Sequence, residues 1–272
     1  MHTQFKYFNV EKVNGLAKVI INRESKANAL NHEAWLELGL VFKALSELED
    51  ISVVMLMGEG KNFSAGMDLS TLMEIPSKWD GDCEARKRLQ IQAFIKEIQQ
   101  SISQIEECRW PVIACVHGAC IGGAMSILTA CDMAFCSRDA YFSIRETDLG
   151  IVADIGVLQR MPMWVNPSML SELAYTARKF DAKEASEMGL VNKVYDSKDT
   201  LLDKVTETAD DMASKSPLVI SGIKKILKYK RNHSVEESLD YVSTWNAAYL
   251  LSEDLNRAMM AYMNKSKPNF RS

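Results

Sequence analysis

The chain has 272 residues, of which 47% are hydrophobic and 25% are charged, and its formal net charge is −4. This balance is typical of a soluble globular protein and excludes a disordered chain. A chain of this length can bury a large core, either as one α/β domain or as a domain with an appendage. The weak negative charge argues against a nucleic-acid binder, because neutralising phosphates requires a strong basic excess.

Recognisable signals for targeting, membrane insertion and metal binding are missing from the sequence. The first residues lack the apolar core of a secretory signal and the Arg-rich character of a mitochondrial presequence, and the final tripeptide is not Ser-Lys-Leu. No apolar run approaches the roughly 18 residues that span a bilayer. The six cysteines lack C-x-x-C spacing and the four histidines are scattered. We therefore expect a cytoplasmic protein with reduced thiols that binds no metal, membrane or nucleic acid.

The first elements predicted along the chain are a hairpin, a helix and a strand. Strand-forming residues over Phe5–Asn22 surround Asn14-Gly15, a pair typical of a tight hairpin turn. Apolar residues at three- and four-residue steps predict an amphipathic helix over Asn31–Leu48. The continuous apolar run Ile51–Met57 then predicts a buried strand.

A second cycle follows the same order. The long, periodic and charged segment Cys83–Cys108 predicts a helix. The pattern then predicts, in order, a strand over Pro111–Val116, a turn over Gly118–Gly123, a helix over Ala124–Ala130, and strands over Met133–Cys136 and Ala140–Ile144. Two passes of strand, strand and helix favour a repeating right-handed α/β unit.

The last third of the chain is predicted to be helical. Helices are expected over residues 200–215, 218–232 and 234–263, and we place a domain change between residues 1–200 and 201–272. The last of these helices carries an apolar stripe made of Trp245, Tyr249, Leu250, Met259, Met260 and Tyr262. Such a stripe must pack either on its own core or on another subunit.

Two glycine-containing turns, Phe63–Asp68 and Gly118–Ala124, each follow a strand and precede a helix. Neither has the glycine spacing of a P-loop or of a dinucleotide fingerprint. Backbone N–H groups at a helix start are unpaired, so two such turns facing each other can bind a developing oxyanion. The alternative is that the glycines only permit tight turns or close packing.

The chain resembles a known superfamily at these turns. Residues Phe63–Leu69, Pro111–Asp132 and 140–194 resemble the enoyl-CoA hydratase/isomerase, or crotonase, superfamily. The segments Glu146–Gly150, Ala153–Arg160 and Glu172–Lys179 are most similar to its Δ3,5-Δ2,4-dienoyl-CoA isomerases. The resemblance implies a crotonase-like spiral of ββα turns, followed by a helical region that assembles a homotrimer or homohexamer. It also implies an acyl-CoA thioester as substrate and no cofactor besides the coenzyme A that this substrate carries.

The resemblance assigns roles to four residues. The backbone N–H groups of Met67 and Gly123 match the oxyanion hole that holds the thioester carbonyl. Glu146 matches the catalytic glutamate that is most widely used in the superfamily. Asp154 lies in an apolar segment, where a carboxylate must be paired or have a raised pKa. Glu146 and Asp154 are therefore the expected proton-transfer pair, with a structural helix cap as the alternative for Asp154.

Other predicted contacts surround these residues. Ser126 stands where hydratases carry a second glutamate and dienoyl-CoA isomerases an aspartate, and it is either inert or positions water or substrate. Further predicted substrate or CoA contacts are Arg23, Lys26, Ala65, Gly66, Asp68 and Leu69, with Lys224 or Lys225 reaching across from the helical region. The span Ser70–Arg88, with Pro76, Trp79 and Gly81, is expected to form the wall of the acyl pocket. Asp132 and Asp148 are expected in turns or ion pairs.

Four functions remain open at this point. The favoured function is a dienoyl-CoA isomerase that uses Glu146 and Asp154. A Δ3-Δ2-enoyl-CoA isomerase would need Glu146 alone, because one carboxylate can serve both carbons of a 1,3 shift. An enoyl-CoA hydratase is less favoured because Ser126 is no carboxylate. A non-catalytic acyl-CoA-binding protein is the remaining alternative.

Overall fold

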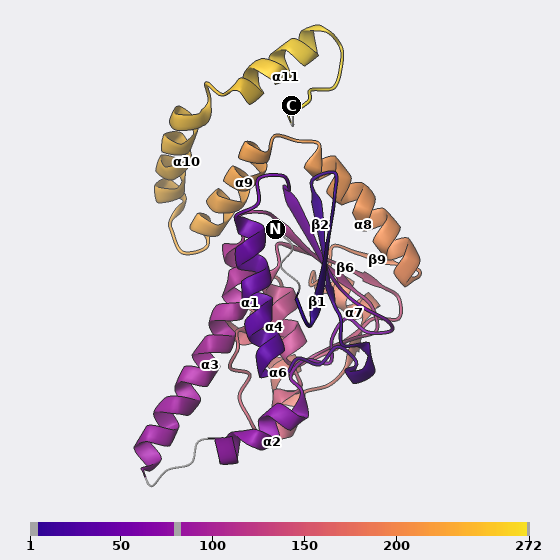
Figure 1. Ribbon diagram of the computed structural model, residues 1–272, viewed down its shortest axis with the longest axis vertical. Helices are drawn as coiled ribbons and strands as arrows, with labels where there is room; N and C mark the ends of the chain where they lie inside the picture. The colour runs from indigo at the N-terminus through magenta and orange to yellow at the C-terminus, as the bar shows by residue number, and fades with distance from the viewer. Residues whose placement is uncertain (1–4, 79–82, 271–272) are drawn as a thin grey trace.

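Strands and helices alternate along most of the chain in the computed structural model, which describes residues 5–78 and 83–270 (Figure 1). The main sheet has the order β1-β2-β3-β4-β6-β9, and every neighbouring pair except β1 and β2 is parallel. Its strands are β1 (Phe8–Val13), β2 (Leu16–Ile21), β3 (Val53–Gly58), β4 (Val112–Val116), β6 (Met133–Ser137) and β9 (Lys193–Tyr195). The predicted α/β class is therefore confirmed.

The predicted hairpin is formed by β1 and β2. Its turn residues Asn14 and Gly15 have φ values of 49° and 85°. Two consecutive positive φ values match the right-handed twist of the strands, and Asn-Gly tolerates them well. The local sequence signal was therefore sufficient to place this turn.

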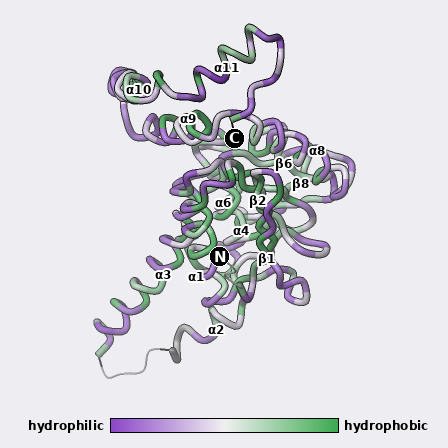
Figure 2. Tube along the Cα trace, turned by 45° about the horizontal axis from the view of Figure 1, so that its top comes forward, coloured by the Kyte–Doolittle hydropathy of each residue, from purple (hydrophilic) through white to green (hydrophobic). Residues whose placement is uncertain are grey.

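Helices cover both faces of the sheet because its central strands are apolar on both sides. On β3, Val54 and Leu56 belong to a large core cluster, whereas Val53, Met55 and Met57 belong to a second cluster. Figure 2 shows hydrophobic residues gathered around β2 and the helices beside it. Burial on both faces explains why this strand is a continuous apolar run rather than an alternating one.

The large cluster includes residues of α1 (His32–Ser46), α3 (Glu84–Glu107) and α4 (Gly123–Ala130). The second cluster includes residues of α8 (Lys198–Ala213). Shorter helices connect the remaining elements: α2 (Leu69–Lys78), α5 (Val157–Arg160), α6 (Pro167–Thr176), α7 (Ala182–Glu187) and the 3₁₀ turns Glu24–Lys26, Arg145–Leu149 and Met161–Met163. The helices that the first half of the sequence predicted are thus all present.

A three-stranded sheet lies beside the main one, and the sequence did not predict all of it. It contains β5 (Ala119–Ile121), β7 (Tyr141–Ser143) and β8 (Phe180–Asp181). The segment predicted only as a turn, Gly118–Gly123, therefore includes a strand. Tertiary contacts make this segment a strand, because β5 pairs in parallel with β7 and the backbone of Cys120 forms an isolated parallel β-bridge with Ser64.

The C-terminal region contains α9 (Pro217–Lys230), α10 (Val235–Tyr249) and α11 (Glu253–Met263). The prediction of one helix over 234–263 was wrong. Ser252 caps α11 by accepting the Leu255 N–H at 3.3 Å, and acidic Glu253 and Asp254 follow in the first turn. These start signals favour a new helix over continuation of the previous one.

The predicted domain boundary between residues 200 and 201 falls inside α8 and stays a prediction. α8 spans that boundary and packs on the sheet through Leu201, Val205, Ala209 and Ala213. After α8 the chain leaves the sheet, and Figure 1 shows α9, α10 and α11 extending away from it.

Within residues 5–78 and 83–270, no helix combines the length and apolar character needed to cross a membrane. The same residues include no group of three or more His, Cys, Asp or Glu side chains placed to hold a metal ion. All six cysteines are free thiols, and all except Cys83 are buried.

Lys224 of α9 ties the C-terminal region to the core instead of reaching toward CoA. Its ammonium group lies 2.8 Å from Asp132 Oδ2 and donates to the Trp110 and Ile105 carbonyls at 2.9 and 3.2 Å. Asp132 also accepts the Val112 N–H at 2.8 Å. The expected CoA contact of Lys224 is therefore wrong, because the side chain is 6% exposed and fully engaged. The expectation that Asp132 forms an ion pair is met.

We expect Lys224→Met to lower the free energy of unfolding by about 3 kcal/mol, because it leaves the partly buried Asp132 carboxylate without its cation. Urea unfolding followed by circular dichroism measures this loss. Lys225→Met is the matched control, since Lys225 is exposed and only lies over the Trp245 ring at 4.9 Å. Equal losses in the two variants would contradict a specific role for the buried lysine.

Candidate active site

The two glycine turns lie side by side, as expected for a shared site. Ser64 N donates to Ala119 O at 2.9 Å, and Ile121 N donates to Ser64 O at 3.2 Å. A Cβ added to Gly66 would lie 2.3 Å from Ile121 O and 2.9 Å from Gly123 N. Gly66 also has a φ of +83°, so only glycine permits this approach of the two backbones.

Met67 and Gly123, the expected oxyanion-hole residues, line the same cavity. Gly123 is the first residue of α4, where a backbone N–H has no partner within its own helix. Gly122, with a φ of +56°, turns the chain from β5 into this helix start. The arrangement can therefore offer amide donors to a ligand carbonyl.

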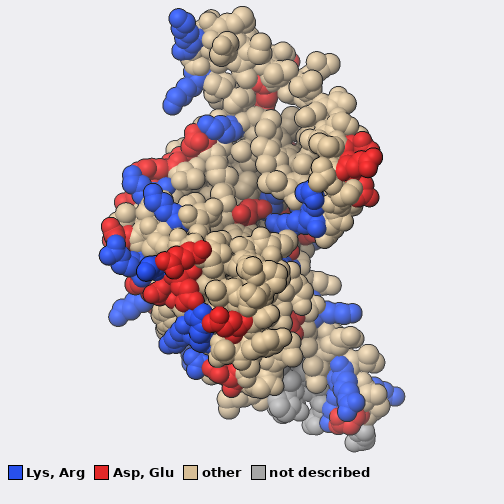
Figure 3. Space-filling view, turned by 180° about the vertical axis from the view of Figure 1, so that it is seen from behind, with Lys and Arg blue, Asp and Glu red and all other residues tan. Residues whose placement is uncertain are grey.

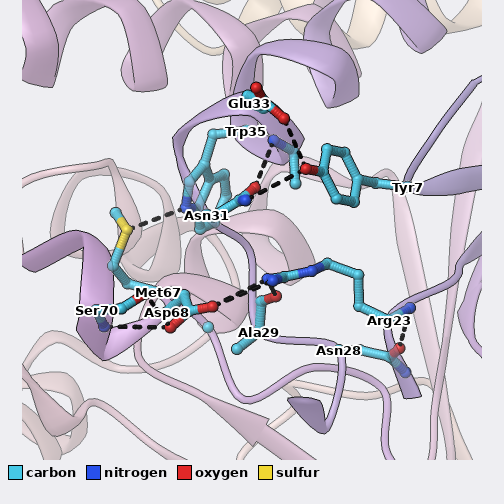
Figure 4. A network of polar contacts seen from close by, with 12 residues as sticks. Tyr7, Arg23, Asn28, Ala29, Asn31, Glu33, Trp35, Met67, Asp68 and Ser70 are labelled. Carbon is cyan, nitrogen blue, oxygen red and sulfur yellow. Dashed lines mark hydrogen bonds and ion pairs between the residues drawn. The ribbon is translucent and has the colours of Figure 1, made fainter. Parts of the chain in front are cut away.

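A polar network supports the turn that contains Met67 (Figure 4). Both outer nitrogens of Arg23 lie 3.2 Å from Asp68 Oδ2, and Arg23 also donates to the Ala29 carbonyl. Burial alone would raise the pKa of Asp68, but hydrogen bonds from Ser70 and Arg23 outweigh it and lower that pKa. Of the residues that the structure describes, those lining the cavity do not include Arg23. Arg23 thus forms an ion pair with Asp68, and its CoA contact stays a prediction.

The cavity has a volume of about 690 Å³ and is mainly apolar, with a few charged groups. α3 contributes Ile91, Phe94, Ile95 and Ile98, and α2 contributes Leu69 and Leu72. The expected pocket wall over Ser70–Arg88 is thus partly observed, while Trp79 and Gly81 lie outside the described residues. The size and lining suit an apolar ligand with a polar head group.

Glu146 lies in the cavity wall, in the 3₁₀ turn that follows β7. The residue is 8% exposed, and its Oε2 atom has no hydrogen-bond partner among the described residues. A Cβ added to Gly122 would lie 3.6 Å from Glu146 Oε1, which places the carboxylate beside the turn that contains Gly122 and Gly123. Burial raises the pKa of Glu146, and the charge of Asp154 adds to this effect. A poorly solvated, unpaired carboxylate is suited to accept a proton.

Asp154 lines the same cavity from the loop before α5. Its backbone carbonyl accepts a 2.6 Å hydrogen bond from Gln99 Nε2 of α3, which anchors the loop. The residue is exposed overall, yet partial burial in the cavity wall raises the pKa of its carboxyl group. Two carboxylates with raised pKa values therefore share one cavity.

Ser126 does not occupy the position expected of a substrate contact. It is completely buried, and its Oγ accepts the Val157 N–H at 3.1 Å. Neither Ser126 nor Gly66 is among the described residues that line the cavity. Ser126 caps the start of α5 and Gly66 faces the neighbouring backbone, so the cavity lining supports neither as a substrate contact, and both contacts stay predictions. The predicted residues that do line the cavity are Lys26, Ala65, Met67, Asp68, Leu69, Gly123, Glu146 and Asp154.

No sequence motif indicated that α3 lines the cavity or that Trp35 contacts Met67. The apolar stripe of α3 predicted only core packing, yet part of it forms the cavity wall. Gln99, which anchors the Asp154 loop, carries no recognisable motif. Trp35 was interpreted only as part of the apolar face of its helix.

Similar proteins were found by sequence and by structure. The chain is 47% identical over 253 residues to a peroxisomal Δ3,5-Δ2,4-dienoyl-CoA isomerase of Arabidopsis thaliana, covering 93% of this chain and 91% of the relative. It is 41% identical over 248 residues to the mitochondrial isomerase of that name from Mus musculus, covering 91% and 76%. An enoyl-CoA hydratase from Bacillus anthracis superposes with a TM-score of 0.88 at 27% identity, covering 98% of this chain and 99% of that chain.

The names of these relatives contradict the expected cytoplasmic location. One relative is named peroxisomal and the other mitochondrial. The expectation was wrong because it depended on the absence of a recognisable address in the sequence, and such an absence does not identify a compartment.

The match at the family level covers nearly the whole chain. Residues 11–272 match the family described as enoyl-CoA hydratase/isomerase. This span contains both glycine turns, the cavity residues Glu146 and Asp154, and the C-terminal helices. The chain belongs to the enoyl-CoA hydratase/isomerase family.

Proposed function

We propose that this protein is an isomerase of unsaturated fatty acyl-CoA thioesters that converts Δ3,5-dienoyl-CoA into Δ2,4-dienoyl-CoA. The observation that carries the proposal is the presence of Glu146 and Asp154, both with raised pKa values, in the cavity lined by Met67 and Gly123. The two isomerases with 47% and 41% identity carry this activity in their names.

In the proposed mechanism, the Met67 and Gly123 amides donate to the thioester oxygen. Glu146 removes a proton from the substrate α-carbon, and the C–H electrons delocalise through the diene onto that oxygen. Protonated Asp154 then delivers a proton to the ε-carbon, which leaves the double bonds conjugated with the carbonyl. Afterwards Glu146 holds a proton and Asp154 has lost one, so exchange with solvent restores the starting state.

The proposal includes no cofactor besides the coenzyme A of the substrate. Lys26 is exposed and lies at the cavity, which supports it as a contact for the anionic CoA portion. Lys225, the other lysine of the C-terminal region that was expected to reach CoA, lies over the Trp245 ring.

A Δ3-Δ2-enoyl-CoA isomerase is the second candidate. It is favoured by one observation: Glu146 is buried and its Oε2 atom has no hydrogen-bond partner among the described residues, whereas Asp154 is exposed. A 1,3 shift needs one carboxylate that reaches two nearby carbons, so Glu146 alone would suffice.

The deciding experiment offers three acyl-CoA substrates to the purified protein. We expect a 3,5-dienoyl-CoA to give the absorbance of a conjugated 2,4-diene at the highest rate. Hydration of a 2-enoyl-CoA should be very slow, because Ser126 is buried and supplies no carboxylate for water. Faster turnover of a 3-enoyl-CoA would favour the second candidate. Fast hydration would overturn both isomerase proposals, and binding without any turnover would indicate a non-catalytic protein.

We further propose that the chain assembles into a homotrimer or homohexamer through its C-terminal helices. Large apolar side chains are exposed on α10, on α11 and in the turn between them, including Leu239, Leu250, Met259, Met260 and Tyr262. Figure 3 shows a mainly uncharged surface over the upper end of the molecule, where these helices lie. Exposed apolar surface of this extent is typical of an interface. Light scattering at micromolar concentration should give three or six times the mass of one chain, and a monomeric mass would contradict assembly.

A further inference from the structure

Trp35 of α1 contacts one side of the proposed oxyanion hole through its ring nitrogen. The side chain is completely buried, and its Nε1 atom donates to Met67 Sδ at 3.2 Å (Figure 4). Figure 4 shows the indole extending from α1 toward the turn that contains Met67 and Asp68. The described residues that line the cavity do not include Trp35. Trp35 therefore holds the thioether of Met67 from behind the cavity wall.

The same ring also contacts the other side of the hole. A Cβ added to Gly123 would lie 2.9 Å from Trp35 Cζ2 and 3.1 Å from Cη2. Gly123 therefore lies directly against the six-membered part of the indole. One rigid side chain touches both residues that supply the proposed amide donors.

The start of α1 is firmly joined to the turn containing Met67. Leu30 N donates to Gly66 O at 2.7 Å, and Asp68 N donates to Leu30 O at 2.9 Å. These bonds hold the backbone on both sides of Met67. Asn31 then caps α1 by accepting the Ala34 N–H at 3.0 Å. The helix start, the indole and the turn consequently form one unit.

We propose that Trp35 is a positioning residue that sets the separation of the Met67 and Gly123 amides. This inference rests on the proposed function, because it requires that these amides hold the thioester oxygen. Donors of this kind act only within a narrow range of distances from the developing charge. A displacement of about 1 Å is enough to lower the rate by as much as about 10²-fold.

The kinetic test compares Trp35→Phe with Trp110→Phe. Trp110 is also buried, but its Nε1 atom donates to Leu48 O at 3.1 Å, and the described lining of the cavity does not include it. We expect Trp35→Phe to lower kcat by about tenfold or more while KM changes by less than about twofold, since the amide donors contribute most where charge develops in the transition state. Trp110→Phe should leave kcat within about twofold of the unmodified protein, although it removes a hydrogen bond of similar length.

A double-mutant cycle tests whether the effect passes through Met67. Met67→Leu removes the sulfur acceptor and keeps the backbone amide, so it should lower kcat, as Trp35→Phe does. Trp35→Phe and Met67→Leu combined should lower kcat less than the product of the two single effects, because both remove the same contact. Independent, multiplicative effects would overturn the proposal.

A spectroscopic measurement separates this inference from the proposed function. Octanoyl-CoA, isotope-labelled at the thioester carbonyl, has no double bond to isomerise, so its bound carbonyl stretch reports hydrogen bonding alone. We expect a downshift in the unmodified protein and in Trp110→Phe, and a smaller downshift in Trp35→Phe and Met67→Leu. A full downshift in Trp35→Phe would overturn the role of Trp35, whereas no downshift in the unmodified protein would overturn the oxyanion hole. If Trp35→Phe does not fold, Met67→Leu decides the outcome by the same criteria.

Discussion

Replacing Glu146 with glutamine is expected to lower kcat for dienoyl isomerisation by about 10²–10⁴-fold, the usual contribution of a general base. Glutamine keeps the shape of the side chain but cannot accept the proton. Steady-state absorbance at the conjugated-diene wavelength measures the loss, and isothermal titration with octanoyl-CoA should show nearly unchanged binding. A rate close to that of the unmodified protein would show that Glu146 is structural.

Asp148→Asn is the matched control, since Asp148 is a half-exposed carboxylate in the same 3₁₀ turn, paired with Arg145 at 3.4 Å. We expect its kcat to stay within about twofold of the unmodified protein, because an exposed ion pair contributes little.

The pH dependence of kcat/KM provides a second measurement on Glu146. Only the deprotonated carboxylate can act as base, so the rate should fall as the pH drops through the pKa of Glu146. Burial raises that pKa above the ordinary value of 4.5, and the inflection should therefore lie above 4.5. A raised pKa also means that folding disfavours the charged form at neutral pH. Glu146→Gln should consequently be at least as stable as the unmodified protein.

Replacing Asp154 with asparagine is expected to lower the rate of dienoyl isomerisation by about 10²-fold or more and to leave the isomerisation of a 3-enoyl-CoA unchanged. In the dienoyl reaction the protons move at opposite ends of the diene. A single carboxylate held by packing serves both ends poorly, because proton transfer requires hydrogen-bond reach. The measurement compares both substrates in parallel on one preparation of the variant.

The two activities together distinguish three roles for Asp154. Equal loss of both activities would show that Asp154 mainly orients Glu146 or supports the cavity wall. If neither activity changes, Asp154 is structural, and a mechanism that uses Glu146 alone becomes the better account. Retention of the Gln99 contact keeps the loop in place in Asp154→Asn, since that bond is made to the backbone carbonyl of residue 154.

Some features of this protein were determined by short stretches of sequence. Asn14-Gly15 placed the hairpin, and the apolar run at Ile51–Met57 predicted a strand that is buried on both faces. The glycines of the two turns indicated tight turns or close packing, and a Cβ added to Gly66 would indeed lie 2.3 Å from Ile121 O. Each of these signals is local, because backbone conformation and hydrophobic periodicity depend on residues only a few positions apart.

The partners of individual polar side chains were decided only by the tertiary structure. Arg23 pairs with Asp68, Ser126 caps α5, and Lys224 binds Asp132, although sequence position suggested substrate contacts for all three. A charged or hydroxyl group forms hydrogen bonds or ion pairs with whichever donor or acceptor the folded chain brings near. That neighbour lies 45, 31 or 92 residues away in these cases, so no local pattern can identify it. The family resemblance named candidate residues for the site, whereas the contacts that these residues make arise from long-range packing around the sheet.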